Sequence, residues 1–298
     1  MVTLQQLQYF RELAVTGHLT RTAEKLYISQ TTLSNTIINL EKKLGVKLFD
    51  RVGRSLQLSE AGANYLEYVS QALGALENGR TYLEDYREQG ERKVSLTTSN
   101  SLVWAGLVRG FQNHFRDYSI QQLNSTPDQF RRMLLDMEVD FAITGTDDLS
   151  IAGLEYQVFR EEQLYLCVPE NHPLVGRDSV SLNDIRNEHF INLPQSLPFR
   201  KYCDNLFRKA GIRYHAALEC DYMLRGQLIE AGFGVGLTTQ SGQLTGFLGN
   251  HNRFIPLSDD VPRRPIAIIW NPRRYMGRAA LDFRDYVLNM NYPPYAKG

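Results

Sequence analysis

The chain has 298 residues, of which 43% are hydrophobic and 22% are charged. These proportions are typical of a globular protein, and they exclude a disordered or collagen-like chain. Lysine plus arginine equals aspartate plus glutamate at 33 each, so the whole chain carries no charge bias. At about 100–200 residues per domain, the length predicts about two domains.

The chain has three scattered cysteines, too few for a disulfide framework, and they fit a reducing cytosol. No apolar run approaches the length of about 18 residues that a membrane span needs. The first ten residues are amphipathic and do not resemble a secretory signal peptide. We therefore expect a cytoplasmic protein that does not enter a membrane.

The first 60 residues predict three helices followed by a hairpin, over 4–14, 19–26, 30–44 and 46–58. Gly17 is expected to end the first helix as a C-cap. Ser29 is a favourable N-cap for the third helix, after a tight turn. The hairpin, or wing, is expected to turn around Gly53.

A long helix is predicted next, because apolar residues recur at spacings of three and four residues. The seam consists of Leu66, Val69, Leu73, Leu76, Arg80 and Leu83, of which Arg80 is the one polar interruption. Such a helix can pack on its own domain or pair with a second copy as a coiled coil. The polar residues outside the seam favour the coiled coil, and the charged stretch 87–93 is expected to be a linker.

From residue 94 onward, strands and helices are predicted to alternate, which favours parallel-sheet α/β layers. Strands are expected over 94–98, 119–123, 141–144, 164–168, 190–193, 215–219, 235–238 and 266–270. Helices are expected over 102–115, 128–137, 199–210, 223–231 and 278–288.

A short helix, a three-residue turn and a longer helix are typical of a helix-turn-helix, whose second helix enters the major groove of DNA. Seven polar residues at its start can hydrogen-bond bases or phosphates: Ser29, Gln30, Thr31, Thr32, Ser34, Asn35 and Thr36. Glutamine and asparagine suit bidentate contact to adenine. The alternative is a helix surface that is merely solvated.

Charge supports the DNA-binding interpretation. Residues 1–60 contain 8 basic and 5 acidic residues, a net charge of +3. The rest of the chain contains 25 basic and 28 acidic residues, a net charge of −3. Contact with DNA phosphates requires a positively charged region of this kind. Arg51 and Arg54 flank the wing and are candidate DNA contacts.

Further residues occur in register over the same region: Leu4–Phe10, Ala23–Leu26, Ser29-Gln30, Leu33-Ser34, Ile37, Leu40-Glu41, Leu44-Gly45, Leu48-Phe49, Arg51, Arg54, Leu58 and Ala61-Gly62. Together they resemble the N-terminal signature of LysR-type transcriptional regulators. The chain departs from that pattern at Thr31-Thr32, where the family often has Pro-Ala, and at His18, where a serine is common. These departures bear on operator preference more than on DNA binding.

The resemblance extends over the whole chain and implies its organisation. It implies a winged helix-turn-helix over 1–58, a dimerisation helix and hinge over 59–91, and an effector domain over 92–298. Two lobes, like those of periplasmic binding proteins, would enclose a small effector. Lobe I would comprise 92–161 and 268–298, and lobe II would comprise 162–267. The family further implies a homodimer through the long helix and assembly of dimers into tetramers.

Ligands of open α/β sheets bind beyond the carboxyl ends of the strands. That rule and the resemblance give seven candidate effector contacts: Ser99, Asn100, Ser101, Thr126, Thr144, Phe199 and Thr238. The helix start after Ser99 favours an anion, and Arg200 lies near Phe199 in the sequence, so our hypothesis is a small carboxylate. The alternative for these polar residues is capping and turn chemistry.

Other sites are not supported. The G-x-G-x-G at 232–236 leads from a helix into a strand, the reverse of a dinucleotide site. The six histidines show no metal spacing, and no feature convincingly activates Cys203 or Cys220 for redox sensing. We expect no catalytic residue, metal or cofactor. A second hypothesis remains, a solute-binding or enzymatic α/β protein whose N-terminal helices only mediate assembly.

Overall fold

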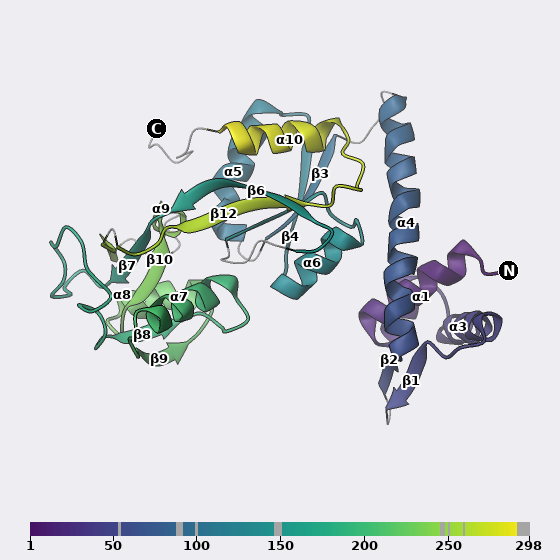
Figure 1. The fold of residues 1–298 in the computed structure, drawn as a ribbon, viewed down its shortest axis with the longest axis horizontal. Coiled ribbons are helices and arrows are strands. Elements are labelled where there is room, and N and C mark those ends of the chain that lie inside the picture. The colour runs from purple at the N-terminus through teal and green to yellow at the C-terminus, as the bar shows by residue number, and fades with distance from the viewer. Residues whose placement is uncertain are drawn as a thin grey trace. The chain divides into compact units, whose positions relative to one another are not determined.

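The computed structural model describes residues 1–52, 55–87, 92–98, 101–145, 151–244, 248–249, 251–258 and 260–290. The chain divides into two compact units. One unit comprises Met1–Gln89 and Leu135–Glu138, and the other comprises Gly90–Leu134 and Val139–Gly298. Figure 1 labels the elements of both units.

The first unit contains the predicted helices and hairpin. Its elements are α1 (Leu4–Thr16), α2 (Leu19–Lys25), α3 (Gln30–Leu44), β1 (Phe49–Val52), β2 (Ser55–Leu58) and α4 (Glu60–Tyr86). The two strands pair in antiparallel register, from Phe49 opposite Leu58 to Val52 opposite Ser55. The wing is therefore confirmed, whereas Gly53 and Arg54 lie outside the described residues.

The predicted caps set the ends of the helices. Gly17 and Gly45 follow α1 and α3 with φ of 69° and 72°, a left-handed conformation that glycine adopts without a steric penalty. The Ser29 hydroxyl accepts a hydrogen bond from Thr32 N and begins α3. Both capping predictions, Gly17 and Ser29, are confirmed.

The core of this unit includes part of α4. Phe10 and Leu33 are fully buried, and Val69 and Leu73 of α4 join the same cluster. The expected seam is therefore not one continuous intermolecular surface. Its first half packs on its own unit, whereas Leu76 and Leu83 are more than half exposed.

The start of α4 approaches the backbone very closely. A Cβ at Gly62 would lie 2.0 Å from Leu48 O, a contact that no side chain tolerates. Ser59 fixes the same junction, since its hydroxyl donates to Lys47 O and accepts from Gly62 N. Gly62 therefore lets α4 begin directly against the segment that leads into the wing.

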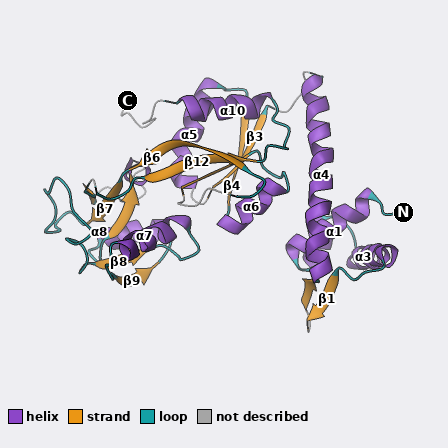
Figure 2. Cartoon of the chain, viewed as in Figure 1, coloured by secondary structure: helices purple, strands orange, loops and turns teal. Residues whose placement is uncertain are grey.

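The second unit contains a five-stranded sheet with the strand order β4-β3-β5-β12-β6. Its strands are β3 (Lys93–Thr98), β4 (Ser119–Asn124), β5 (Phe141–Gly145), β6 (Glu155–Glu162) and β12 (Arg264–Trp270). Its helices are α5 (Ser101–His114), α6 (Pro127–Leu135) and α10 (Arg278–Asn289). These elements, shown by type in Figure 2, form what we call lobe I.

Helices cover both faces of this sheet. Ile266 and Ile268 of β12 pack with α5 and α10, whereas Ala267 and Ile269 pack with α6. Alternate residues of a strand point to opposite faces, so both sets are buried. The result is the three-layer α/β arrangement expected for this part of the chain.

The remaining elements form lobe II around a second core. They are β7 (Leu164–Val168), β8 (His189–Asn192), α7 (Pro198–Lys209), β9 (His215–Glu219), α8 (Tyr222–Glu230), β10 (Gly236–Thr239), α9 (Gln240–Leu244) and β11 (Arg253–Pro256). Strands β10, β7 and β11 form one sheet, and β8 and β9 form another. Gly232 and Gly234 lie between α8 and β10 and Gly236 begins β10, in the helix-turn-strand order that the sequence indicated.

Two expectations need correction. The sheets are not parallel throughout: the five-stranded sheet is mixed, because β12 runs antiparallel to β5 and β6, and the β10-β7-β11 sheet is antiparallel. Three elements, β6, α9 and β11, were not predicted. Strand β6 is a largely exposed edge strand with four charged residues, and α9 and β11 are too short to show a period.

We expect Gly62→Ala to destabilise the first unit by about 1–3 kcal/mol, because the added methyl group would overlap Leu48 O. Gly79→Ala, in the same helix with open space around it, is the matched control and is expected to be neutral or stabilising. Thermal unfolding, with amide hydrogen exchange of α1–α3 to locate the effect, measures both. Equal stability of the two variants would contradict the close approach.

Candidate functional site

Helices α2 and α3 form a helix-turn-helix. The connecting turn places Tyr27 at φ 54°, a conformation that is uncommon for a residue other than glycine. Ala23 and Leu33 bury the inner faces of the two helices in one core. The outer face of α3, which we call the recognition helix, is left exposed along its polar side.

The predicted DNA contacts on this helix fall into two groups. The hydroxyls of Ser29, Thr32 and Thr36 are engaged within the helix, since Ser29 bonds Thr32 and Thr36 donates to Thr32 O at 2.8 Å. By contrast, the side chains of Thr31, Ser34 and Asn35 make no hydrogen bond to any described residue. The second group therefore keeps its polar atoms available for a partner.

Gln30 has a partner that the sequence analysis did not identify. The Thr20 hydroxyl of α2 lies 3.2 Å from Gln30 Oε1, and both side chains are exposed. Only the packing of α2 against α3 brings these residues, ten positions apart, within hydrogen-bonding distance.

The cations of this unit also fall into two groups. Lys25 and Lys47 pair with Glu12 and Glu41, and Lys43 donates to Met1 O and Gln6 Oε1. Arg21 and Lys42 are exposed and pair with no described residue. The sequence analysis missed these two cations, because charge alone does not show which basic residues are already paired.

Of the two predicted wing arginines, Arg51 lies in β1, and the structure does not describe its side chain. Arg54 lies outside the described residues. The prediction that both contact DNA therefore stays a prediction.

In lobe I, the predicted effector contacts follow neighbouring strand ends. Strands β3, β4 and β5 run in parallel, and Thr98 is the register partner of both Asn124 and Ile143. Thr126, which follows β4, and Thr144, near the end of β5, therefore lie at the same edge of the sheet, on the two strands that flank β3. Ser99, Asn100 and the side chain of Ser101 lie outside the described part of the structure.

The four described candidates differ in their surroundings. Thr126 is exposed and caps α6, since its hydroxyl accepts from Gln129 N at 3.4 Å and its own N–H donates to Gln129 Oε1 at 2.9 Å, as the capping alternative anticipated. Thr144, Phe199 and Thr238 are buried. Thr144 Oγ1 is buried and makes no hydrogen bond to any described residue.

Arg264, which the sequence analysis missed, connects the two lobes. Its Nη2 donates to Gly145 O at the end of β5, and its guanidinium carbon lies 5.0 Å from the centre of the Phe199 ring in α7. Gly145 allows this approach, because a Cβ would lie 2.6 Å from that guanidinium carbon, which would then have to shift. This cation therefore lies beside Thr144 and Phe199, two of the predicted effector contacts.

A second connection joins β6 of lobe I to α9 of lobe II. Arg160 and Glu162 form a buried ion pair, and the Ser241 hydroxyl bonds both side chains. A buried charge pair costs free energy unless its members are well hydrogen-bonded, and Ser241 supplies such bonds.

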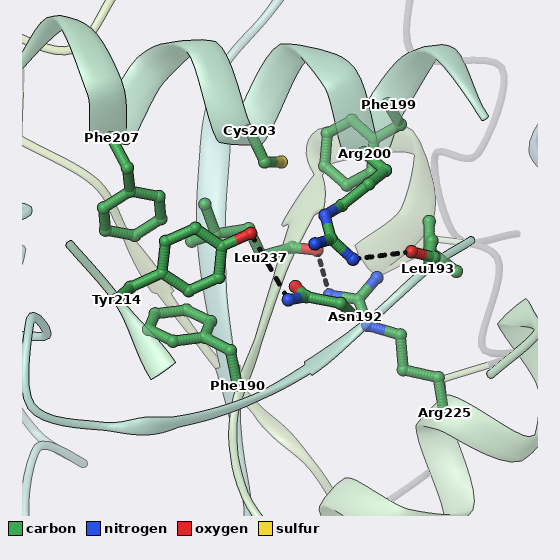
Figure 3. A pocket seen from close by; sticks show the side chains of 10 residues that line it. All are labelled: Phe190, Asn192, Leu193, Phe199, Arg200, Cys203, Phe207, Tyr214, Arg225 and Leu237. Carbon is green, nitrogen blue, oxygen red and sulfur yellow. Dashed lines mark hydrogen bonds between the residues drawn. The ribbon is translucent and has the colours of Figure 1, made fainter. Parts of the chain in front are cut away.

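Behind Phe199, lobe II encloses a small cavity of about 10 Å³, which is room for about one water molecule. Figure 3 shows the rings of Phe190, Phe207 and Tyr214 on one side of it and the guanidinium groups of Arg200 and Arg225 on the other, with the Phe199 ring beside Arg200. Arg225 donates to the backbone carbonyls of Ile191 and Leu237 and so joins β8 to β10.

Arg200 does not play the role that motivated the carboxylate hypothesis. Its guanidinium is buried, and Nε lies 2.8 and 2.9 Å from the two carboxylate oxygens of Asp204. Nη1 donates to Leu193 O and lies 3.4 Å from Glu219. Because its charge is already balanced, Arg200 is a structural residue rather than a free cation for an effector.

Comparison with known proteins decides the family. A model described as "Bacterial regulatory helix-turn-helix protein, lysR family" matches residues 4–63. A second, described as "LysR substrate binding domain", matches residues 87–291, which is more than half of the chain. The chain belongs to the LysR family. It is therefore a DNA-binding transcriptional regulator with an effector-binding domain, which confirms the first of the two hypotheses and the predicted fold class.

Two LysR-family relatives in Bacillus subtilis (strain 168) match almost the whole chain. The "Uncharacterized HTH-type transcriptional regulator YybE" is 29% identical over 290 residues, which cover 96% of this chain and 98% of that protein. The "Transcriptional dual regulator GltC" is 27% identical over 293 residues, which cover 96% of each chain.

Solved structures of full-length LysR-family proteins share the fold. A full-length variant of OxyR from Pseudomonas aeruginosa gives a TM-score of 0.75 at 21% identity and covers 96% of this chain and 95% of that one. Full-length CbnR in complex with its target DNA gives a TM-score of 0.66 at 21% identity, and the match covers 96% of this chain and 99% of CbnR.

The cysteines of this LysR-family chain are not activated thiols. Burial raises the pKa of Cys203 to about 12 and that of Cys167 to about 12, and the nearby Arg225 only partly opposes this effect. Burial also raises the pKa of Cys220. These free thiols therefore remain protonated at neutral pH, in keeping with their interpretation as small apolar residues.

No described helix combines the length and apolar character that a membrane span requires. Among the described residues, no group of three histidine, cysteine, aspartate or glutamate side chains is placed to hold a metal ion.

We expect the double variant Arg21→Ala/Lys42→Ala to lower the slope of log affinity for DNA against log salt by about 2, since each unpaired cation can neutralise one phosphate. Lys25→Ala/Lys43→Ala removes the same charge from groups already engaged within the protein, so its slope should fall by less than about 1. Fluorescence anisotropy at several salt concentrations measures both slopes. An equal fall in the two variants would count against this assignment.

Proposed function

We propose that the chain regulates transcription by reading an operator with the recognition helix while a small molecule in the effector domain adjusts that binding. The observation that carries this proposal is the exposed polar face of α3, where Thr31, Ser34 and Asn35 retain unengaged polar groups. The family model for a regulatory helix-turn-helix covers the same residues.

We assign the reading of base edges to Gln30, Thr31, Ser34 and Asn35, because the first residues of a recognition helix lie nearest the bases. Ser29, Thr32 and Thr36 would contact phosphates, toward which a hydroxyl can turn when DNA arrives. Arg51 and Arg54 of the wing, with Arg21 and Lys42, would supply the charge that phosphate binding needs.

The proposed organisation keeps the boundaries that the resemblance implies: a winged helix-turn-helix over 1–58, a dimerisation helix and hinge over 59–91, and an effector domain over 92–298. The second half of α4 would pair two subunits. The large exposed side chains there support this assignment: Leu76, Tyr82, Leu83 and Tyr86. Two such dimers would form a tetramer.

The effector would bind between the lobes, near Ser99–Ser101, Thr126, Thr144, Phe199 and Thr238. Thr144 supports this location, because its buried hydroxyl has no hydrogen-bond partner among the described residues. A small carboxylate fits the N-terminus of α5, a 14-residue helix that begins at Ser101, and the neighbouring Arg264 adds positive charge.

Effector binding would shift the population of subunit arrangements and so change operator binding, which requires different affinities of the effector for the two states. On this proposal the chain is not an enzyme and acts in the cytoplasm. Its membership of a family of DNA-binding regulators supports both statements.

We expect the full-length chain to bind the DNA directly upstream of its own gene more tightly than scrambled DNA, with a steep dependence on salt. Arg51→Ala/Arg54→Ala should weaken binding to both DNAs and flatten the slope, whereas Asn35→Ala should reduce the preference between them. Fluorescence anisotropy measures all of these quantities. Weak and salt-insensitive binding to both DNAs, with and without a pool of metabolites, would contradict the proposal.

A thermal-shift screen of organic acids and amino acids tests the ligand class. We expect at least one small carboxylate to raise the melting temperature of the wild-type chain, and Thr144→Val to reduce that shift, since the variant keeps the shape of the side chain but removes its hydroxyl. Thr16→Val is the control, because its hydroxyl bonds Glu12 O in α1. A neutral compound that raises the melting temperature while every acid leaves it unchanged would exclude a carboxylate.

A further inference from the structure

The contact between Thr20 and Gln30 determines which polar group of Gln30 faces outward. Thr20 is the second residue of α2 and Gln30 the first of α3. The Thr20 hydroxyl donates to Gln30 Oε1 at 3.2 Å, whereas Gln30 Nε2 makes no hydrogen bond to any described residue. The carbonyl of the amide is thus turned toward α2, and its NH₂ group is left for a partner.

The position of Thr20 in its helix explains why its hydroxyl takes this partner. Threonines within the helices of this chain donate to the carbonyl four residues earlier, as Thr16, Thr22, Thr36 and Thr81 do. For Thr20, the residue four positions earlier belongs to the end of α1. Because no carbonyl of its own helix lies below it, the hydroxyl is directed across the turn to Gln30.

This arrangement changes the expected base preference. Bidentate contact to adenine uses both halves of a glutamine amide, since Oε1 accepts from N6 and Nε2 donates to N7. The Thr20 hydroxyl uses one of the two lone pairs of Gln30 Oε1 and holds the carbonyl toward α2, so the amide directs its two N–H donors, rather than its oxygen, toward the bases. Guanine is the matching purine, because it presents two acceptors, N7 and O6, in the major groove.

We propose that Thr20 is a positioning residue that makes Gln30 a hydrogen-bond donor toward DNA, so that the regulator selects a G·C pair rather than an A·T pair at the position that Gln30 reads. This inference rests on the proposed function of the recognition helix and refines it. The adenine contact expected from residue type alone is replaced by a guanine contact.

Selection from a randomised DNA duplex library with the full-length protein, followed by sequencing, tests the proposal. The same selection with the Gln30→Ala variant identifies the base pair that Gln30 reads, because the variant loses its base preference at that position of the DNA. We expect a G·C pair there in the wild-type library, favoured about tenfold over A·T, the discrimination typical of one good contact. Replacing that guanine by 7-deazaguanine should weaken binding of the wild type and leave Gln30→Ala unaffected.

Three variants at the contact and one control separate positioning from a structural role. Thr20→Val keeps the shape but removes the donor, so the preference for G·C over A·T at this position should fall to near equality, with the salt slope unchanged. Thr20→Ser keeps the hydroxyl and should keep the preference. Gln30→Glu presents only acceptors and should lose it. Thr16→Val makes the same chemical change in α1 and is the control, so it should select the same DNA sequences as the wild type.

The outcomes are distinguishable. A wild-type motif with A·T at the position that Gln30 reads, or a motif that Thr20→Val or Gln30→Glu leaves unchanged, would overturn the role of Thr20 alone. A wild-type chain that enriches no sequence would overturn both this role and the recognition helix. Should Thr20→Val fail to fold, as seen by a melting temperature well below that of Thr20→Ser, the Gln30→Glu library decides.

Discussion

The DNA-binding unit depends on one buried carboxylate that joins the recognition helix to the wing. Glu41, in the last turn of α3, is only 7% exposed. Its Oε1 accepts hydrogen bonds from Leu48 N and Phe49 N, and Lys47 Nζ lies 2.6 Å from Oε2. Charge-assisted bonds of this kind offset the cost of removing a carboxylate from water. Because Leu48 also presents its carbonyl to Gly62, the recognition helix, the wing and the start of α4 are fixed at one point.

This junction holds the helix whose polar side chains we propose to read DNA. The hydroxyls of Ser29, Thr32 and Thr36 stabilise the helix itself. Gln30, which Thr20 orients, and the unengaged side chains of Thr31 and Asn35 are left to face a partner. Side chains held by their neighbours lose less conformational entropy on binding, so a fixed helix supports selective contacts.

The effector domain relies on a different constraint, the two links between its lobes. Arg264 joins the end of β5 to the Phe199 ring, and Arg160 and Glu162 meet Ser241 of α9. Both links lie where the chain passes between the lobes, so a change in the angle between the lobes must alter them. An effector acts on such a domain through the difference in its contacts between the two arrangements.

The sequence by itself determined the helices of the first unit, the caps at Gly17 and Ser29, the wing and the family signature, because periodicity, capping and turn chemistry act over a few neighbouring residues. It also indicated that Thr126 and Thr144 lie at the carboxyl ends of strands. Only the tertiary structure decided that Val69 packs inward, that Arg200 is paired with Asp204, that β12 runs antiparallel, and that Arg264 reaches Phe199. Each of these depends on which distant residue supplies the partner, and a local pattern contains no information about that choice.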